Sequence, residues 1–366
     1  MNTAIEGINL EQAVKAIIAG GSQRTVILQG DTGSGKTQGT RVMLMNAFPK
    51  HKFIQMDCPA LDVGDLMIPR FKDMEGNDYV QFVPNERLGL HLKEPVIVNI
   101  DEIGKGSRSI QNALRPFILQ RELNGIKLHP DSIIYCTTNL GAEGLGDVLL
   151  PHQRNSVTFI KLRKSTNLEF IQWGALNNIN PLILGWAKEE PALFQSFTDV
   201  PNPTDNPYIY HPREEREQFT TNRSLAAASF WVDKRDEFDQ ETLTSLLVGT
   251  IGAPAALNLM TFISLAAEFP SIESIKQDPF SAIVPSKLNG QCYVLFRAMA
   301  AMERDWVDQW MDYATRLNAE VMAVFASAIL NRANGEVHPK QKLFTTNGKF
   351  TDWAVANRFL FSADKV

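Results

Sequence analysis

Residues 30–37 read Gly30-Asp31-Thr32-Gly33-Ser34-Gly35-Lys36-Thr37, which matches the pattern GxxxxGK[ST] of a phosphate-binding loop. Glycines let backbone N–H groups approach an anion without a Cβ in the way, and a following helix points its positive end at the same anion. An apolar strand is expected at residues 25–28, just before the loop, and a helix over residues 38–46, just after it. This context favours a phosphate loop over an ordinary glycine-rich turn.

The last two residues of the loop carry its most specific chemistry. A lysine at the position of Lys36 reaches the β- and γ-phosphates of a nucleoside triphosphate, and a hydroxyl at the position of Thr37 binds Mg²⁺. We therefore expect Mg²⁺ and a nucleoside triphosphate to bind at residues 30–37.

The second motif is a pair of acidic residues at the end of a predicted buried strand. Residues 96–102 read Val-Ile-Val-Asn-Ile-Asp-Glu, so the strand delivers Asp101 to its C-terminal tip, where ligands bind in open α/β sheets. Asp101 is expected to hold Mg²⁺, and Glu102 to orient and deprotonate the attacking water. The alternative is a pair of acidic loop residues that form surface salt bridges. Asn99 interrupts the apolar run and needs hydrogen-bond partners if it is buried.

A third strand, expected over residues 132–137, ends close to Asn139. An amide at this position can hold the lytic water or sense the γ-phosphate. Taken alone, Asn139 is better explained as a turn or helix-cap residue.

The pattern of apolar residues predicts three regions. Residues 1–165 alternate short strands with helices, as in an α/β domain with a parallel sheet flanked by helices, and an Asn124-Gly125 turn predicts a β-hairpin. Helical spacing dominates from 166 to 275, and a further helical section covers 276–366. Between the helices, Val200–Pro212 is rich in Pro, Asn and Asp and is expected to be a surface loop.

Composition limits the class of protein. Of the 366 residues, 44% are hydrophobic and 21% charged, an ordinary globular balance, and the net charge of -5 disfavours a surface built wholly for nucleic acid. The three cysteines have no CxxC spacing and the six histidines are scattered, which favours reduced thiols in a cytoplasmic protein without a zinc cluster.

The uncharged run 242–267 is long enough to span a bilayer. Because glycines and a proline interrupt it, we expect two buried helices and no membrane segment.

The order and spacing of these motifs resembles the AAA+ ATPases, specifically the MoxR-like branch that includes CbbQ. Further matching stretches are Leu61–Leu66, Val80–Pro84, Gln111–Leu114 and the hairpin at Asn124-Gly125. The resemblance covers roughly residues 8–270. It implies an ATPase core followed by an all-helical lid and a helical C-terminal extension, and a ring, usually a hexamer, with ATP bound between subunits.

The resemblance also assigns roles to two arginines. Arg154 stands where the family keeps an arginine that reaches a neighbouring subunit's γ-phosphate, and Arg223 matches the second sensor at the start of the lid helix. A guanidinium suits both roles because its charge and fork stabilise transition-state oxygens. Without the family, either arginine is a solvated charge at a helix end.

Members of this branch act as remodelling chaperones, often beside a protein that carries a von Willebrand A domain. The resemblance therefore implies an ATP-driven remodeller of a protein partner. Two other classes stay open. One is a DNA-acting motor or loader, for which Lys105, Arg108, Lys127 and residues 161–164 supply basic charge. The other is a nucleotide-gated scaffold with little turnover, which the catalytic set of Glu102, Asn139 and Arg154 disfavours.

Overall fold

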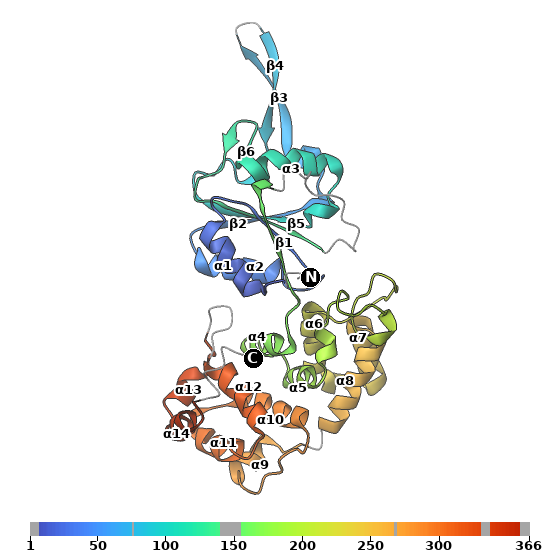
Figure 1. Ribbon diagram of the computed structural model, residues 1–366, viewed down its shortest axis with the longest axis vertical. Coiled ribbons are helices and arrows are strands. Elements are labelled where there is room, and N and C mark those ends of the chain that lie inside the picture. Colours follow the sequence, from blue (N-terminus) through green and yellow to red (C-terminus); the bar gives the residue numbers. More distant parts are fainter. Residues whose placement is uncertain (1–6, 75–76, 140–154, 267–268, 331–336, 359–366) are drawn as a thin grey trace, which may run out of the picture. The chain divides into compact units, whose positions relative to one another are not determined.

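The computed structural model describes residues 7–74, 77–139, 155–266, 269–330 and 337–358. The chain divides into two compact units, Met1–Lys164 and Ser165–Val366. The first unit combines strands and helices around a parallel sheet, and the second is built from helices (Figure 1). The predicted class is therefore confirmed: an α/β core with a parallel sheet flanked by helices, followed by a helical region.

The sheet of the first unit has five parallel strands in the order β2-β5-β8-β1-β9. Their bounds are Val26–Gln29 for β1, Lys52–Asp57 for β2, Val96–Asp101 for β5, Ile133–Thr138 for β8 and Thr158–Lys161 for β9. Because the strands are parallel, their C-terminal ends all lie along one edge of the sheet. The loops that follow β1, β5 and β8 are thereby brought together.

Helices cover both faces of this sheet. Alternate strand residues point to opposite faces, so Val26 and Leu28 pack on one side and Ile27 on the other. The first side is covered by α1 (Leu10–Gly20) and α2 (Gln38–Ala47), and the second by α3 (Arg108–Gln120). This three-layer arrangement (Figure 1) buries the central strands β1, β5 and β8 on both faces, which explains their continuous apolar runs.

The first unit also contains two antiparallel hairpins. The shorter pairs β6 (Glu122–Leu123) with β7 (Ile126–Lys127), and both residues of its Asn124-Gly125 turn have positive φ, at 52° and 79°. A type I′ turn needs positive φ at both central positions, so the hairpin predicted from Asn-Gly is confirmed.

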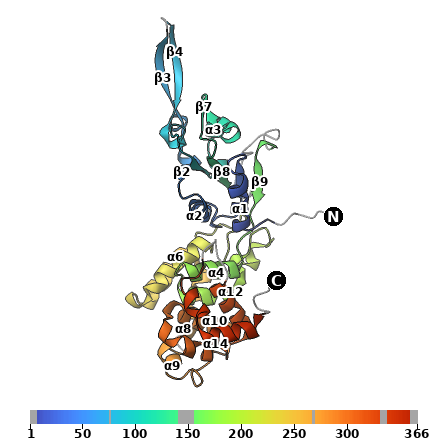
Figure 2. The same cartoon turned by 90° about the vertical axis from the view of Figure 1, so that its left-hand side faces the viewer.

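The longer hairpin pairs β3 (Met67–Met74) with β4 (Asn77–Pro84) and extends away from the sheet in both views (Figures 1 and 2). Several of its large apolar side chains are exposed, among them Phe71 at 79% and Phe82 at 47%. The side chain of Asn124 donates a hydrogen bond to the backbone carbonyl of Phe82 at 3.1 Å. The turn of the short hairpin therefore holds the base of the long one.

The second unit contains eleven α-helices within its described residues. They are α4 (Asn167–Leu176), α5 (Pro181–Glu189), α6 (Asn222–Asp233), α7 (Gln240–Ile251), α8 (Ala253–Ala266), α9 (Ile272–Gln277), α10 (Leu288–Ala301), α11 (Val307–Ala314), α12 (Ala319–Leu330), α13 (Gln341–Thr345) and α14 (Gly348–Ala356). One hydrophobic core runs through them from Phe170 to Phe350, with α5 and α10 buried along most of their length. The division between a lid and an extension at residue 276 stays a prediction, because helices from both sides share this core.

The uncharged run 242–267 falls on α7 and α8, which meet at Gly252 with φ of 85°. The predicted pair of helices is confirmed. Among the residues that the structure describes, no helix is both long and apolar enough to cross a membrane.

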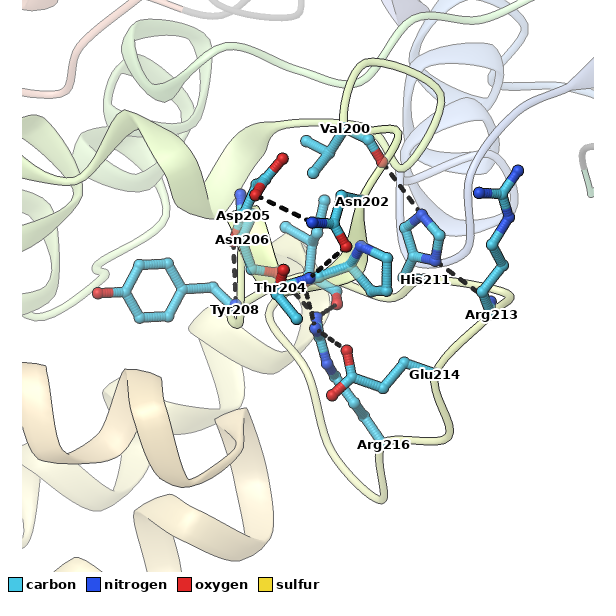
Figure 3. A network of polar contacts seen from close by, with 12 residues as sticks. Val200, Asn202, Thr204, Asp205, Asn206, Tyr208, His211, Arg213, Glu214 and Arg216 are labelled. Atoms are coloured by element: carbon cyan, nitrogen blue, oxygen red, sulfur yellow. Dashed lines mark hydrogen bonds and ion pairs between the residues drawn. The ribbon is translucent and has the colours of Figure 1, made fainter.

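The segment Val200–Pro212 has only a short 3-10 helix, Pro203–Asp205, and is a loop as expected. Its predicted surface exposure is wrong for four residues, Val200, Asn206, Ile209 and His211, which are buried. Arg216 explains the difference, since its guanidinium donates to the backbone carbonyls of Pro203, Asn206 and Ile209 and pairs with Glu214 (Figure 3). The guanidinium group of Arg216 thus provides the hydrogen bonds that these backbone carbonyls would otherwise have to form with water.

Candidate functional site

The phosphate loop, Gly30–Thr37, connects the end of β1 to the start of α2. Gly33 and Gly35 have φ of 72° and 85°, a backbone conformation that residues with a Cβ rarely adopt. Lys36 is 7% exposed, and its ammonium donates to the backbone carbonyls of Gly30 at 2.8 Å and Asp31 at 2.6 Å. The lysine is therefore curled back over the loop that carries it.

The loop is fixed to the sheet at its first residue. The backbone N–H of Gly30 donates to the carbonyl of Thr138 at 3.2 Å, which joins the ends of β1 and β8. Asn139 comes directly after Thr138 and is buried at 4% exposure. Asn139, the predicted sensor residue, therefore follows directly after the residue whose backbone is hydrogen-bonded to the first residue of the phosphate loop.

Thr37 and Asp101 meet across the C-terminal edge of the sheet. The hydroxyl of Thr37 lies 2.9 Å from Oδ1 and 3.1 Å from Oδ2 of Asp101. The hydroxyl of Thr137, in β8, donates to Oδ1 of the same carboxylate, and the amide of Gln55, in β2, lies 3.4 Å from Oδ2. Three neighbouring elements of the fold therefore converge on one carboxylate.

This donor set fits Mg²⁺. Magnesium prefers hard oxygen ligands, keeps several waters and is bound in nucleotide sites by one or two protein groups plus phosphate oxygens. The hydroxyl of Thr37 and the carboxylate of Asp101 are oxygen donors in mutual contact at the start of a helix, next to the loop that would hold the phosphates. Thr37 and Asp101 are thus the residues that would hold the ion.

Glu102 follows Asp101 in a left-handed backbone conformation, with φ of 49°. Its backbone N–H donates to the hydroxyl of Thr137 at 3.2 Å, and its carboxylate pairs with Lys105 at 3.0 Å. A non-glycine residue in this conformation costs about 1–3 kcal/mol and is found at functional sites where the surroundings enforce it. The turn moves the Glu102 side chain out of the strand that ends at Asp101.

Two polar atoms in the loop have no hydrogen-bond partner within the described part of the chain, Oδ1 of Asp31 and Oγ of Ser34. Buried polar atoms are normally paired, so these two are suited to meet a ligand or its water shell. Directly after the end of β2, burial raises the pKa of the Cys58 thiol to about 12, with a smaller contribution from the charges of Asp57 and Asp101. Cys58 is thus a neutral packing residue.

The described structure does not test the roles predicted for two of the site residues. Arg154 lies outside the described residues. Arg223 belongs to the second unit, where it is the second residue of α6 and is exposed. Thr221 caps that helix by accepting the backbone N–H of Ser224 at 3.0 Å. Their roles in hydrolysis stay predictions.

Three contacting residues were not identified from the sequence: Thr137, Gln55 and Lys105. Thr137 lies inside a strand that reads as buried, and Gln55 lies in the strand at the far edge of the sheet, so only the strand order reveals that both face Asp101. Lys105 could have been found, since it stands only three residues after Glu102 and carries the opposite charge.

The fold and the site together have the features that the sequence predicts for a P-loop ATPase core: a five-stranded parallel sheet, a glycine-rich loop after β1, a threonine hydroxyl in contact with an aspartate carboxylate, and a helical unit later in the chain.

No protein-family model matches the chain, and a search of the curated proteins finds no match. Among solved structures, a RuvB mutant from Thermotoga maritima is 16% identical with a TM-score of 0.37, covering 70% of this chain and 68% of that one. An ATPase described as putative, from Cytophaga hutchinsonii, is 14% identical with a TM-score of 0.30, covering 86% and 79%. NtrX from Brucella abortus, solved with ADP, is 12% identical with a TM-score of 0.37, covering 98% and 70%. Similarity this low says nothing about function.

Proposed function

We propose that this chain hydrolyses Mg-ATP and uses the energy to remodel or activate a protein partner, as the resemblance to MoxR-like AAA+ ATPases implies. The observation that carries the proposal is the meeting of Thr37 with Asp101, at 2.9 Å, beside a loop whose lysine is buried. A structural or binding role alone would not require a hydroxyl, a carboxylate and a strained glutamate at the same edge of the sheet.

The residues divide the work of γ-phosphate hydrolysis among them. The backbone N–H groups of residues 33–37 and the ammonium of Lys36 bind the phosphates, which requires Lys36 to leave the carbonyls of Gly30 and Asp31. Bound Mg²⁺ would neutralise charge on the β- and γ-phosphate oxygens. Glu102 accepts the proton of the attacking water, and Asn139 orients that water by hydrogen bonding.

Glu102, the proposed proton acceptor, forms an ion pair in this structure. Glu102 contacts Lys105 at 3.0 Å, and both side chains are more than a third exposed. An exposed pair of this kind is worth at most about 1 kcal/mol, so it breaks readily when the site closes around a substrate. Glu102 is then available to the water without a large cost in free energy.

Assembly into a ring, with six subunits as the resemblance implies, completes the proposed site. In that arrangement Arg154 of one subunit would reach the γ-phosphate bound by its neighbour. Arg223 would contact the same phosphate from α6 of the helical unit and relay hydrolysis to it. The guanidinium group suits both roles because it offers a fixed fork of donors.

A protein partner is supported by the exposed apolar surface of the β3–β4 hairpin. Phe71, Val80 and Phe82 are exposed by 79%, 45% and 47%, and the strand register places all three on one face of the hairpin. Exposed clusters of large apolar side chains mark interaction surfaces. A partner with a von Willebrand A domain, as the resemblance suggests, is the first to test.

The DNA-acting alternative finds less support. Two of the basic residues that it requires form ion pairs, Lys105 with Glu102 at 3.0 Å and Lys127 with Glu122 at 3.7 Å. Their charge is compensated locally, and the charged surface offered to phosphates is reduced. Binding to DNA that weakens steeply with salt and stimulates hydrolysis would restore this alternative.

The proposal is tested with Glu102→Gln, which keeps the shape of the side chain and removes its basicity. We expect steady-state phosphate release to fall by about 10²–10⁴-fold while ATP still binds, so a partner is captured with the ATP-bound variant and released with ADP. Glu122→Gln is the matched control, because Glu122 also pairs with a lysine but lies away from the phosphate loop. Normal hydrolysis by Glu102→Gln would remove the assigned base.

A further inference from the structure

Beneath Asp101, polar side chains cross the sheet on the face covered by α1 and α2. Asn99 of β5 is in register with Gln55 of β2 on one side and with Tyr135 of β8 on the other. Asn99 and Tyr135 are both 0% exposed. Since strand residues two apart point to the same face, Asn99 stands directly below Asp101 on the side that Thr37 contacts.

The helix α2 supplies a fourth polar group to this layer. Thr37, at the start of α2, contacts Asp101, and Thr40 follows three residues later with 0% exposure. Residues three apart share a face of a helix, as residues two apart share a face of a strand. Thr40 is therefore placed over Asn99 as Thr37 is placed over Asp101.

Three members of this layer, Asn99, Tyr135 and Thr40, are buried and find no side-chain hydrogen-bond partner among the described residues. Within the described residues, Nδ2 and Oδ1 of Asn99, the hydroxyl of Tyr135 and the hydroxyl of Thr40 lack any hydrogen-bond partner. Each unpaired buried group is costly, and native proteins have only a few in every hundred residues. Four such atoms in one layer therefore point to a missing ligand that both donates and accepts hydrogen bonds.

Water is the ligand that this chemistry fits. A buried water makes about three hydrogen bonds to groups that are otherwise unsatisfied, and an amide with two hydroxyls supplies both donors and acceptors. We propose that Asn99, Tyr135 and Thr40 enclose a buried water site, and that this site positions the Asp101 carboxylate for Mg²⁺. The second part of this inference rests on the proposed function.

One hydrogen bond and one electrostatic effect connect the layer to the carboxylate. The amide of Gln55 lies 3.4 Å from Oδ2 of Asp101 and stands beside Asn99 in the sheet. Tyr135 is near enough for the charge of Asp101 to raise its pKa, after the larger effect of burial, while Arg41 lowers it. Asn99, Tyr135 and Thr40 thus act through Asp101 and are positioning residues.

Tyr135→Phe tests the inference because it removes one hydroxyl and keeps the ring. If the hydroxyl binds a buried water, we expect the melting temperature measured in EDTA without nucleotide to fall by about 2–4 °C. The Mg²⁺ concentration for half-maximal binding to the nucleotide complex should rise by about tenfold or more. A crystal structure of the apo chain should show the water between Asn99 and Tyr135.

The opposite results overturn the inference. If the hydroxyl is simply unpaired, Tyr135→Phe leaves the melting temperature unchanged or raises it, and the water site is refuted. A lower melting temperature with an unchanged Mg²⁺ requirement refutes the positioning role.

Tyr313→Phe is the matched control, since this tyrosine also donates from a buried position, at 2.8 Å to the carbonyl of Ile283 in the second unit. It should lower the melting temperature without changing the Mg²⁺ requirement. If the wild type binds no nucleotide at all, the proposed function fails, and the melting temperatures still decide the water site.

Discussion

Thr137 donates a hydrogen bond from its hydroxyl to Oδ1 of Asp101. The same hydroxyl accepts the backbone N–H of Glu102 at 3.2 Å. One side chain of β8 therefore fixes both the carboxylate that would hold Mg²⁺ and the turn that presents the proposed base. The residue proposed to bind Mg²⁺ and the residue proposed to activate water are thus coupled through a third residue that need not touch the substrate.

Thr137→Val should remove the hydrogen bonds that couple Asp101 to Glu102 while the strand stays folded. Valine keeps the branched shape and loses the hydroxyl, so Asp101 and the Glu102 turn become less well fixed. We expect the Mg²⁺ requirement of hydrolysis to rise by about tenfold or more, with nucleotide binding retained in the absence of metal. Titration of activity against Mg²⁺ measures this effect.

Thr138→Val is the control for that experiment. Thr138 is the next residue of the same strand, is equally buried, and its hydroxyl has no partner in the described part of the chain. Its replacement should leave the Mg²⁺ requirement unchanged. Equal effects of the two substitutions would show that Thr137 acts only through packing.

His338 should make the second unit sensitive to acid. Burial lowers its pKa from 6.5 to about 4, and the nearby charge of Lys340 acts in the same direction. The unfolded chain therefore takes up the proton first, so stability is complete above pH 6.5 and is lost as the pH falls towards 4. The loss amounts to at most about 3 kcal/mol in the free energy of unfolding.

Urea denaturation at pH 7 and pH 4.5 measures this loss. His338→Asn removes the titrating group and keeps an acceptor for the backbone N–H of Lys340, which His338 now accepts at 3.1 Å. The variant should lose less stability than the wild type between the two pH values. His91→Gln, at an exposed position, should behave as the wild type does. An unchanged pH dependence in His338→Asn would show that other groups cause the acid sensitivity.

Arg216→Lys should destabilise the loop drawn in Figure 3. The guanidinium contacts three backbone carbonyls and Glu214 at once, and an ammonium on a flexible stem cannot reproduce that fork. We expect a loss of about 2–3 kcal/mol in the free energy of unfolding. Arg213→Lys is the control, since Arg213 is exposed and makes one long contact, 3.3 Å, to the carbonyl of Pro201. Equal stability of the two variants would contradict the role of Arg216.

The parts of the fold that were predicted correctly depend on local sequence. The apolar runs of β1, β5 and β8 are buried on both faces, and Asn124-Gly125 needs no partner elsewhere to form its turn. The edge strand β9 was missed because it is short and only partly buried. The β3–β4 hairpin was missed because its apolar side chains face away from the core, against the usual rule.

In the candidate site too, the residues predicted correctly belong to local motifs, and the residues that were missed depend on the arrangement of the strands. The residues 30–37, Asp101 and Glu102 carry their chemistry in a local motif. Thr137 and the buried layer at Asn99 depend on strand order, which sets β8 beside β5 and is not written in either strand. The left-handed turn at Glu102 is likewise a product of its surroundings, since nothing in the sequence Asp101-Glu102 requires positive φ.

Binding of a fluorescent ATP analogue to the purified wild type and to Lys36→Ala tests the central claim most directly. Lys36 is buried against Gly30 and Asp31 and is expected to move onto the phosphates. We predict saturable, Mg²⁺-dependent binding to the wild type and a loss of affinity of about 100-fold or more in Lys36→Ala, with Lys15→Ala on the exposed face of α1 unchanged. Equal affinity in the wild type and Lys36→Ala, or no binding in either, would contradict the account.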